Sequence, residues 1–549
     1  MHEFELKFEI PAQSLPKIVA AVHAKKAQLQ ILQACYFDSK DGALAKNGLT
    51  LRMRKEGNDW VQTAKGLTSN SFDRLEHNVE IGSFQTNVAK KIVPSTKSTS
   101  KLTNPMPSID LSRHADEKVG KLMIKALKIK SNGQIPALLP MYETDVQRLK
   151  FTVKKSGSLI EIALDQGMVI SGGRSAALCE LEIELKQGKP EHAIALARTW
   201  CAKYELWLST INKSMKGQRL HDGLPYLEHK SGEDKPELDS DALNRDSNGQ
   251  QMVKAVFQSC LNQILANASE IASGSQNAEY IHQLRVGIRR LRTAMRELTI
   301  LVDGIDTAWE KPLITAFRGL GEHRDGDHLN HVLQPQIAAE GGPDVSTKID
   351  AAKFLDASLV VRSKVFQDTL LCLMVYVNGS YLDGSSPNAG KNMPENTKEN
   401  YKHKKVSNLL ANRLDKLYEK IIKEGKKFLT LTETQQHSVR KHFKRLRYLA
   451  EFSAPLFAAS PSDKKRSLAF ISALKPVQDA LGFYNDELNA LQTYRTLAAK
   501  DERAWFGAGW LSARRQKNAK KCQQEIDIFI KNTSNKISKK TSHKKLFWQ

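Results

Sequence analysis

The spacing of the apolar residues changes once along this chain of 549 residues, and that change limits the folds open to it. Up to about residue 187, apolar and polar residues alternate in short segments, as in β-strands with one buried face. After residue 250 the apolar residues recur every three to four positions, as in amphipathic helices. The polar, acidic stretch 221–248 between them is typical of a linker. The sequence therefore predicts an α+β multidomain protein, β-rich first and all-helical after the linker.

Several short segments of the first part carry the strand pattern most clearly. They are 2–10, 34–39, 49–55, 60–66, 72–81, 143–154, 158–168 and 177–187. An insert, 82–142, separates the fifth strand from the sixth and contains a helical pattern at 116–129. Residues 190–208 also read as a helix, because their apolar side chains recur at helical spacing. We therefore expect eight strands with at least two helices beside them.

The composition also sets the expected domain boundaries. We expect a β domain over 1–220, a linker over 221–248, a helical domain over 249–505, a disordered loop over 378–405, and a basic C-terminal helix and tail over 506–549. The loop is expected because its sequence is polar and of low complexity.

Charged residues share one register on nearly every predicted strand. Glu3, Glu5 and Lys7 lie two residues apart and so point to one face. The same test groups Arg52 with Arg54, Arg74 with Glu76, Arg148 with Lys150, Glu161 with Asp165, and Glu180 with Glu182, Glu184 and Lys186. One such strand would usually be a solvated sheet face. The joint pattern instead predicts an eight-stranded closed antiparallel barrel with a charged lumen.

Such a lumen has the chemistry of phosphate recognition. Its arginines can bind phosphate oxygens in bidentate fashion, and its lysines, including Lys65, act as point charges. Its clustered carboxylates would repel one another unless a hard divalent cation, Mg²⁺ or Mn²⁺, bridged them. This combination predicts metal-assisted phosphoryl hydrolysis.

Ordered sequence blocks in the first 220 residues resemble the CYTH family of triphosphate tunnel metalloenzymes. The blocks are Glu3-Phe4-Glu5-Leu6-Lys7, Tyr36-Phe37-Asp38, Leu51-Arg52-Met53-Arg54, the segment 60–65, the segment 162–165, the segment 180–186 and Lys213-Ser214. The resemblance implies an antiparallel barrel that binds triphosphate inside. The family includes class IV adenylyl cyclases, thiamine triphosphatases, RNA triphosphatases and inorganic triphosphatases, and the lumen residues alone do not choose among them.

The resemblance also implies roles for individual side chains. The metal ligands would be Glu3, Glu5, Glu182 and Glu184, with Glu180 able to replace one of the last two. The phosphates would be held by Lys7, Arg52, Arg54, Lys65, Arg148 and Lys213. Asp165 and Glu76 would support a second metal ion or the attacking water.

A basic motif occurs twice in the helical part, 155 residues apart. The first copy consists of His282, Arg285, Arg289 and Arg292, and the second of His437, Arg440, Lys444 and Arg447. Each set spans an arc of about 80° on a helical wheel, opposite an apolar stripe. A Leu-Gly-x3-Asp segment also recurs, which indicates a duplicated helical unit. Like charges stacked on one arc repel, so a polyanion between the two helices would explain them.

Residues 250–505 resemble the CHAD family, whose helical domains bind polyphosphate through histidines and basic residues. The resemblance implies that both basic motifs bind inorganic polyphosphate. Nucleic acid is the main alternative partner, and we disfavour it because neither charged arc carries the aromatic residues that stack on bases. The net charge of +23 agrees with any polyanion and does not choose among them.

The expected location is cytoplasmic, with association to polyphosphate granules as an extension of it. The six cysteines are scattered without a CxxC pair, and the longest apolar run, 370–377, is far shorter than the roughly 18 residues of a membrane span. The first residues also lack the pattern of a signal peptide. We therefore expect no membrane association, and the sequence leaves the oligomeric state open.

The order of the two resemblances is that of bacterial CYTH–CHAD inorganic triphosphatases. It implies metal-dependent hydrolysis of tripolyphosphate to pyrophosphate and phosphate in the barrel, with polyphosphate binding by the helical domain. The alternatives are a class IV adenylyl cyclase, a thiamine triphosphatase, or a scaffold that binds polyphosphate without catalysis.

Overall fold

The computed structural model of the chain describes residues 2–68, 72–83, 106–129, 135–224, 243–345, 356–379, 405–534 and 546–549. The chain folds into two compact units. Unit 1 consists of Met1–Glu233, Leu265–Gln276 and Val361–Gly379. Unit 2 consists of Asp234–Ile264, Asn277–Val360 and Ser380–Gln549.

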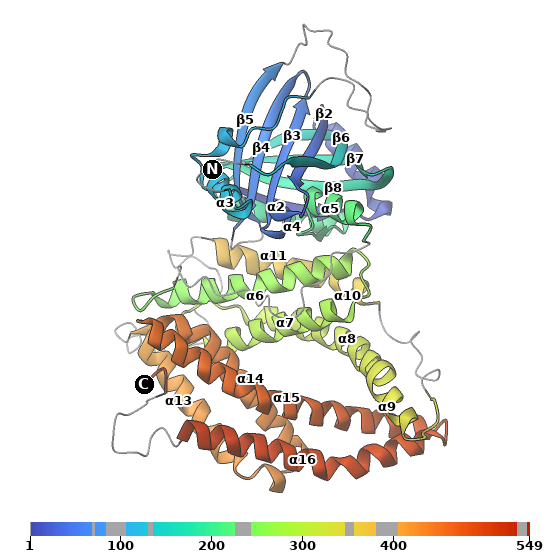
Figure 1. Cartoon of the computed structure of the whole chain (residues 1–549), viewed down its shortest axis with the longest axis vertical. Helices are drawn as coiled ribbons and strands as arrows, with labels where there is room; N and C mark the ends of the chain where they lie inside the picture. The colour runs from blue at the N-terminus through green and yellow to red at the C-terminus, as the bar shows by residue number, and fades with distance from the viewer. Residues whose placement is uncertain are drawn as a thin grey trace. The chain divides into compact units, whose positions relative to one another are not determined.

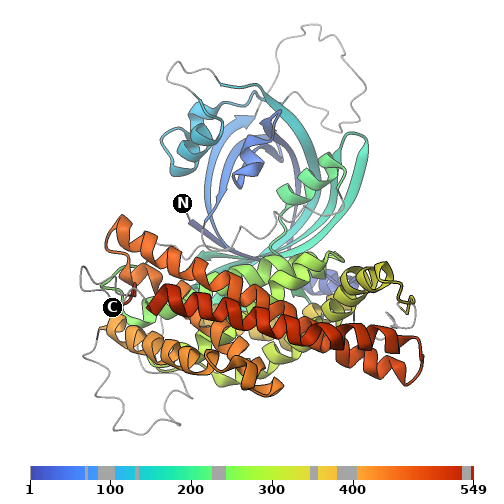
Figure 2. The same ribbon diagram turned by 60° about the horizontal axis from the view of Figure 1, so that its bottom comes forward.

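Unit 1 is built on one antiparallel sheet that closes on itself. Its strands are β1 (His2–Glu9), β2 (Gln28–Ser39), β3 (Leu49–Glu56), β4 (Asp59–Leu67), β5 (Asp73–Ser83), β6 (Leu138–Lys155), β7 (Ser158–Ser171), β8 (Arg174–Gln187) and β9 (Trp207–Leu208). The strand order is β5-β4-β3-β2-β6-β7-β8-β1-β9, and a further pairing of β5 with β1 closes the ring. Figure 2 shows this ring of strands. The predicted eight-stranded antiparallel barrel is confirmed, with the two-residue β9 added at β1.

Helices cover parts of the outer face of the sheet. The helices of unit 1 are α1 (Leu15–Ala24), α2 (Ala43–Lys46), α3 (Lys118–Ala126), α4 (Pro190–Tyr204), α5 (Lys213–Asp222) and α11 (Lys364–Asn378). Of these, α5 packs on the inward face of the sheet, where its Leu220 joins Leu32 and Val146 of the cavity lining. The predicted helix of the insert is α3, whose Val119 and Met123 pack into one apolar cluster with Leu51 of β3 and Ala64 of β4. The insert's helix therefore packs on the outer wall of the barrel. Much of the insert, 84–105 and 130–134, lies outside the described residues.

The helix predicted at 190–208 ends four residues early. Glu205 takes a left-handed conformation with φ 57°, which ends α4. Trp207 and Leu208 then pair with β1 as β9. Their apolar side chains fit a helix and a strand equally well, so helical spacing alone did not distinguish the two.

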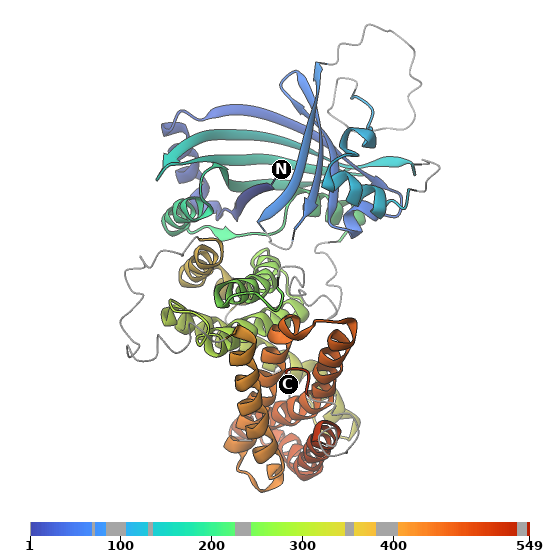
Figure 3. The ribbon, with the colours of Figure 1, turned by 90° about the vertical axis from the view of Figure 1, so that its left-hand side faces the viewer.

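The described residues of unit 2 form helices joined by turns, with no strand among them (Figure 1). The helices after the linker, besides α11, are α6 (Gly249–Ala272), α7 (Ala278–Glu297), α8 (Glu310–His328), α9 (Gln334–Ala339), α10 (Ala357–Arg362), α13 (Val406–Gly425), α14 (Glu433–Phe457), α15 (Pro461–Ala498) and α16 (Ala504–Ser534). Figure 3 shows α13 to α16 packed together. The apolar stripe predicted for α7 is buried as expected, with Leu284, Ile288 and Leu291 fully enclosed. The loop predicted at 378–405 lies almost wholly outside the described residues.

The end of the chain is anchored in unit 2. Residues 535–545 of the predicted basic tail lie outside the described part, but Leu546, Phe547 and Trp548 are buried. The Trp548 ring meets Phe470 edge to face, with 4.9 Å between centroids, and its Nε1 donates to Asp415. The tail therefore ends in an apolar anchor, because burying two large aromatic rings is favourable.

The cysteines and the helices agree with two of the simpler expectations. All six cysteines are free thiols. Within the described parts of the chain, no helix combines the length and the apolar character needed to cross a membrane.

Candidate active site

The inward faces of the strands enclose a cavity of about 640 Å³. Most of the charged residues predicted for the site line it: Glu5, Lys7, Arg52, Arg54, Lys65, Glu76, Arg148, Glu182, Glu184 and Lys213. Asp165 lies behind this lining and is fully buried. Glu3 lies on β1, but its side chain is outside the described residues. The alternation along each strand therefore brought distant charges into one cavity.

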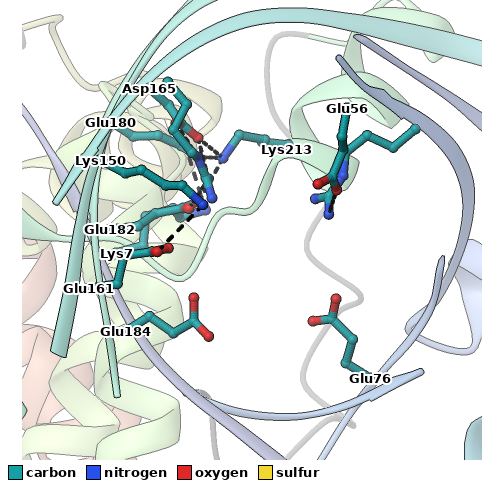
Figure 4. Close-up of polar contacts among 12 residues, drawn as sticks. Lys7, Glu56, Glu76, Lys150, Glu161, Asp165, Glu180, Glu182, Glu184 and Lys213 are labelled. Carbon is teal, nitrogen blue, oxygen red and sulfur yellow. Dashed lines mark hydrogen bonds and ion pairs between the residues drawn. The ribbon is translucent and has the colours of Figure 1, made fainter. Parts of the chain in front are cut away.

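The most tightly paired cation of the cavity is Lys213, at the first position of α5. Asn212 caps this helix by accepting a hydrogen bond from the Met215 backbone N–H, which fixes where α5 begins. The Nζ of Lys213 lies 2.7 Å from Asp165, 2.5 Å from Glu180 and 2.6 Å from Glu182. Figure 4 shows Lys213 reaching toward this group.

Arg148 of β6 contacts two of the same carboxylates, Asp165 and Glu182. Its Nε and Nη2 each donate to one oxygen of Asp165 at 2.7 Å, and Nη2 also donates to Glu182. Burial alone raises the pKa of Glu182, but Lys213 and Arg148 hold that pKa well below its usual range. Glu182 is therefore an ionised carboxylate that already binds two cations.

A second acidic group lies on β1, β8 and β7. Glu5 stands directly opposite Glu184 on the paired strand, and Glu184 stands opposite Glu161. Burial, together with the charges of Glu5 and Glu161, raises the pKa of Glu184 despite an ion pair with Lys186 at 2.6 Å. Glu184 and Glu76 point into the open centre of the barrel from opposite walls (Figure 4).

Cations gather on β3, β4 and β5, away from this acidic group. Arg52 and Arg54 of β3, Lys65 of β4 and Arg74 of β5 all line the cavity. Burial and the charges of Arg52 and Arg148 lower the pKa of Arg54 to about 10. The buried Nε atoms of Arg54 and Arg74 have no hydrogen-bond partner among the described residues. Buried donors in such an electropositive wall suit an anionic ligand.

Lys7 lies beside Glu180 and is almost completely buried. Its Nζ donates to the Ile211 carbonyl and lies 4.0 Å from Glu180. Burial lowers the pKa of Lys7 to about 8, with Glu180 opposing the shift. Lys7 therefore keeps its proton at neutral pH but binds it less firmly than an ordinary lysine.

Our sequence analysis missed Lys216, one turn after Lys213 on α5. Its Nζ contacts Glu9 at 2.8 Å and Glu180 at 2.9 Å. The signal was present, because residues three apart on a helix share a face. It was overlooked because no helix was predicted at this point of the chain.

The donor set fits a hard divalent cation at the second acidic group. Glu5, Glu161 and Glu184 offer carboxylate oxygens to one side of the cavity, and oxygen ligands are what Mg²⁺ and Mn²⁺ prefer. A cation there would relieve the repulsion that raises the pKa of Glu184. Asp165, Glu180 and Glu182 also lie close enough together to hold a metal ion, but Lys213 contacts all three.

The first basic motif lies along α7 and faces α8. Arg285 and Arg289 stack over the ring of Phe317, at 4.7 and 5.3 Å from its centroid. Arg292 pairs with Glu310 at 2.9 Å, while His282 is half-buried. An aromatic ring therefore lies against this motif, contributed by the neighbouring helix rather than by the charged arc itself.

The second basic motif lies along α14 and faces α15. The His437 Nδ1 lies 2.7 Å from Asn485 Oδ1, and Arg447 contacts Glu451 at 2.8 Å. Arg440 and Lys444 are half-buried on the same helix. Each copy of the motif thus lies against the helix that follows it in the chain, which is α8 for the first copy and α15 for the second.

The two arginines that fall outside the motifs join α7 to α14. Arg290 of α7 lies 3.9 Å from Glu451 of α14, and Arg445 of α14 pairs with the fully buried Glu297 of α7. Arg290 and Arg445 occupy equivalent positions of the two copies. These two arginines therefore join α7 to α14, whereas the cations of the two motifs face α8 and α15.

Comparison with known families agrees with both sequence resemblances. Residues 1–217 match the CYTH domain and residues 255–495 match the CHAD domain. The inorganic triphosphatase of Haemophilus influenzae is 26% identical to this chain over 228 residues, which are 40% of this chain and 55% of that protein. The chain thus matches only about half the length of this curated relative.

Two solved structures are also similar. The CHAD domain of Ricinus communis matches with 20% identity and a TM-score of 0.42, covering 54% of this chain and 97% of that one. HpAC1 from Hippeastrum, described as a candidate adenylyl cyclase with a dominant triphosphatase activity, matches with 15% identity and a TM-score of 0.27, covering 41% of this chain and 99% of that one. From the two domain matches, the chain belongs to the proteins in which a CYTH domain is followed by a CHAD domain.

Proposed function

We propose that the barrel hydrolyses inorganic triphosphate to pyrophosphate and phosphate with the help of a divalent cation. The observation that carries this proposal is the division of the cavity into a cationic wall on β3 to β5 and an acidic group on β1, β7 and β8. The inorganic triphosphatase among the similar proteins supports the same reaction.

The proposed reaction follows from this division of charge. Arg52, Arg54, Lys65 and Arg74 hold the phosphate oxygens and neutralise their charge. A divalent cation bound by Glu5, Glu161 and Glu184 would polarise the terminal phosphoryl group. Water then attacks that phosphorus, the bond to the bridging oxygen breaks, and pyrophosphate leaves with the electron pair. Lys213 and Arg148 keep Glu182 ionised in the cavity lining, which preserves the charge pattern during the reaction.

The lining favours an inorganic substrate over a nucleotide or thiamine triphosphate. Among the residues that line the described cavity, the aromatic rings are those of Tyr36 and His77. Tyr36 is buried, and one face of its ring stacks on the ring of Tyr142, with 4.7 Å between the ring centroids. His77 in turn meets the His114 ring edge to face, with 5.0 Å between centroids. Both aromatic rings of this lining thus already pack against other rings, and the charges around them suit a phosphate chain better than a base or thiazole ring.

The test is a phosphate-release assay with tripolyphosphate, ATP and thiamine triphosphate, each with and without Mg²⁺. We expect the highest kcat/KM with tripolyphosphate and loss of activity without the metal. Lys65→Ala should lower kcat/KM by about 100-fold or more, because it removes a contact that stabilises transition-state charge. The exposed Lys17→Ala on α1 is the matched control and should change nothing. Faster turnover of ATP or thiamine triphosphate would assign the barrel to one of the other family activities.

For the helical half we propose polyphosphate binding through the two basic motifs. Its support is the CHAD match together with the matched placement of the motifs along α7 and α14. Arg289→Ala combined with Arg440→Ala should weaken the binding of long-chain polyphosphate and reduce its salt dependence, because two phosphate contacts are lost. The exposed Arg495→Ala on α15 serves as the control. An unchanged affinity in the double variant would remove these helices from the proposal.

A further inference from the structure

The ammonium group of Lys213 is already surrounded by carboxylates of the protein itself. A lysine ammonium has three N–H donors and no acceptor. Its three donors face three carboxylates, Asp165, Glu180 and Glu182, at 2.5 to 2.7 Å. A phosphate oxygen could therefore bind Lys213 only by displacing one of these carboxylates.

Three buried carboxylates rarely lie this close without a cation between them. One oxygen of each lies within 4.8 Å of one oxygen of the others, which is the spacing of a metal site. Without a cation, each charge would raise the pKa of the others and favour protonation. Here Lys213, Lys216 and Lys7 lie 2.5, 2.9 and 4.0 Å from Glu180 and bring positive charge to the group. The protein thus supplies the cation that this site requires.

The charges of the whole group also balance. Its cations and anions are equal in number: Lys7, Arg148, Lys213 and Lys216 against Glu9, Asp165, Glu180 and Glu182. A divalent ion added here would leave an excess of positive charge in a buried region, which is unfavourable. The second acidic group differs, because three carboxylates there face two partly exposed lysines, Lys150 and Lys186.

We propose that the Lys213 ammonium permanently occupies the cation position among Asp165, Glu180 and Glu182, so that no divalent ion binds there and, of the acidic groups in the described part of the barrel, the one at Glu5, Glu161 and Glu184 is left to bind one. Lys213 is then a positioning residue that fixes the acidic wall, and it does not contact the substrate phosphates. This inference rests on the proposed metal-dependent function of the same cavity. It assigns one metal ion to a reaction that many hydrolases perform with two.

The test counts bound Mn²⁺ on the full chain without substrate, by electron paramagnetic resonance. We expect one tightly bound Mn²⁺ in the unchanged protein, lost in Glu184→Gln. Lys213→Ala vacates the position among the three carboxylates and should gain a second Mn²⁺. Lys186→Ala removes a lysine from the same cavity but leaves those three carboxylates occupied, so its count should stay at one. Two tight ions in the unchanged protein, or no gain in folded Lys213→Ala, would overturn the inference.

If Lys213→Ala does not fold, Glu182→Gln tests the same inference. If Glu182 is committed to Lys213 and Arg148, this variant should bind Mn²⁺ with unchanged affinity. If Glu182 instead bound the metal ion, or held one of its ligands by a hydrogen bond, the Mn²⁺ affinity should fall by about 10- to 100-fold. That result would show the inference to be wrong. Metal counting uses no substrate, so a failure of the proposed hydrolysis would show separately in the phosphate-release assay.

Discussion

Glu180 shows how strongly single charges in the lumen depend on their neighbours. It is fully buried and accepts from Lys213 at 2.5 Å and Lys216 at 2.9 Å. Burial alone would raise its pKa, and these lysines, together with Lys7, lower it to about 2 instead. The carboxylate therefore stays ionised inside the protein, and its ion pairs stabilise the fold only while it is ionised.

The sign of this pKa shift predicts acid sensitivity. The pKa of Glu180 is lower in the folded chain than its ordinary value of 4.5, so its contribution to stability is complete above that value. The contribution is lost as the pH falls from about 4.5 toward 2, because the unfolded chain takes up the proton first. Urea unfolding of unit 1 followed from pH 7 to pH 3 should show this loss, and Glu180→Gln should flatten the dependence. An equally steep dependence in the variant would show that other carboxylates control it.

Among the secondary-structure elements, helix α5 sets the positions of Lys213 and Lys216 in the barrel. The helix packs on β6 at Gly217, where an added Cβ would lie 2.1 Å from the Tyr142 ring. The Tyr142 hydroxyl also bonds Ser214, the residue after Lys213. The contact is possible only because Gly217 has no side chain, and it holds the start of α5 beside the cavity.

Gly217→Ala should therefore displace α5 from β6. The clash should destabilise unit 1 by about 1–3 kcal/mol, as overpacking of a core does, and it should raise KM for tripolyphosphate more than a surface substitution would. Thermal unfolding and steady-state kinetics measure the two effects. Gly482→Ala on α15 is the control, because an added Cβ there meets nothing within 4 Å. That control should be unchanged or slightly more stable, because alanine is favoured over glycine inside a helix. No loss of stability in Gly217→Ala would contradict this account of the packing.

Over the whole molecule, the last residues of the chain complete the core of unit 2. Trp548 contacts Phe470 and Phe547, and Tyr418 lies 6.2 Å from it between ring centroids. Tyr418 of α13, Phe470 of α15 and Phe529 of α16 thus share one aromatic cluster with the C-terminal residues. A chain that lacked these residues would leave that cluster exposed to water.

Trp548→Ala should accordingly lower the stability of unit 2. The expected loss is about 3–5 kcal/mol, the usual cost of truncating a buried tryptophan, and calorimetry should show it as a lower unfolding temperature. Trp505→Ala is the matched control: because Trp505 is 58% exposed, its replacement should lower the stability of unit 2 only slightly. Tripolyphosphate hydrolysis should persist at temperatures where unit 2 is still folded. Equal effects of the two substitutions would mean that the C-terminal anchor adds no stability.

The sequence predicted the two halves of the chain and most of the cavity lining, because both depend on local spacing. Residues two apart on a strand share a face wherever that strand lies, so Arg52 with Arg54 and Glu182 with Glu184 were identified without knowledge of the fold. Local spacing also has limits. β2 begins at Gln28, six residues before the predicted start at 34. Its first residues are mostly exposed and belong to the strand because they pair with distant β6, which local spacing does not show.

Only the tertiary structure decided which charges pair. Lys213 is 48 residues away in sequence from Asp165, and their contact depends on the whole path of the chain through β8, α4 and β9. No spacing rule reaches that far, because the energy of an ion pair depends on separation in space and on burial. The sequence by itself therefore determined that cations and carboxylates from distant strands share one lumen. The folded chain determined that one of those cations, Lys213, is already bound by three of the carboxylates.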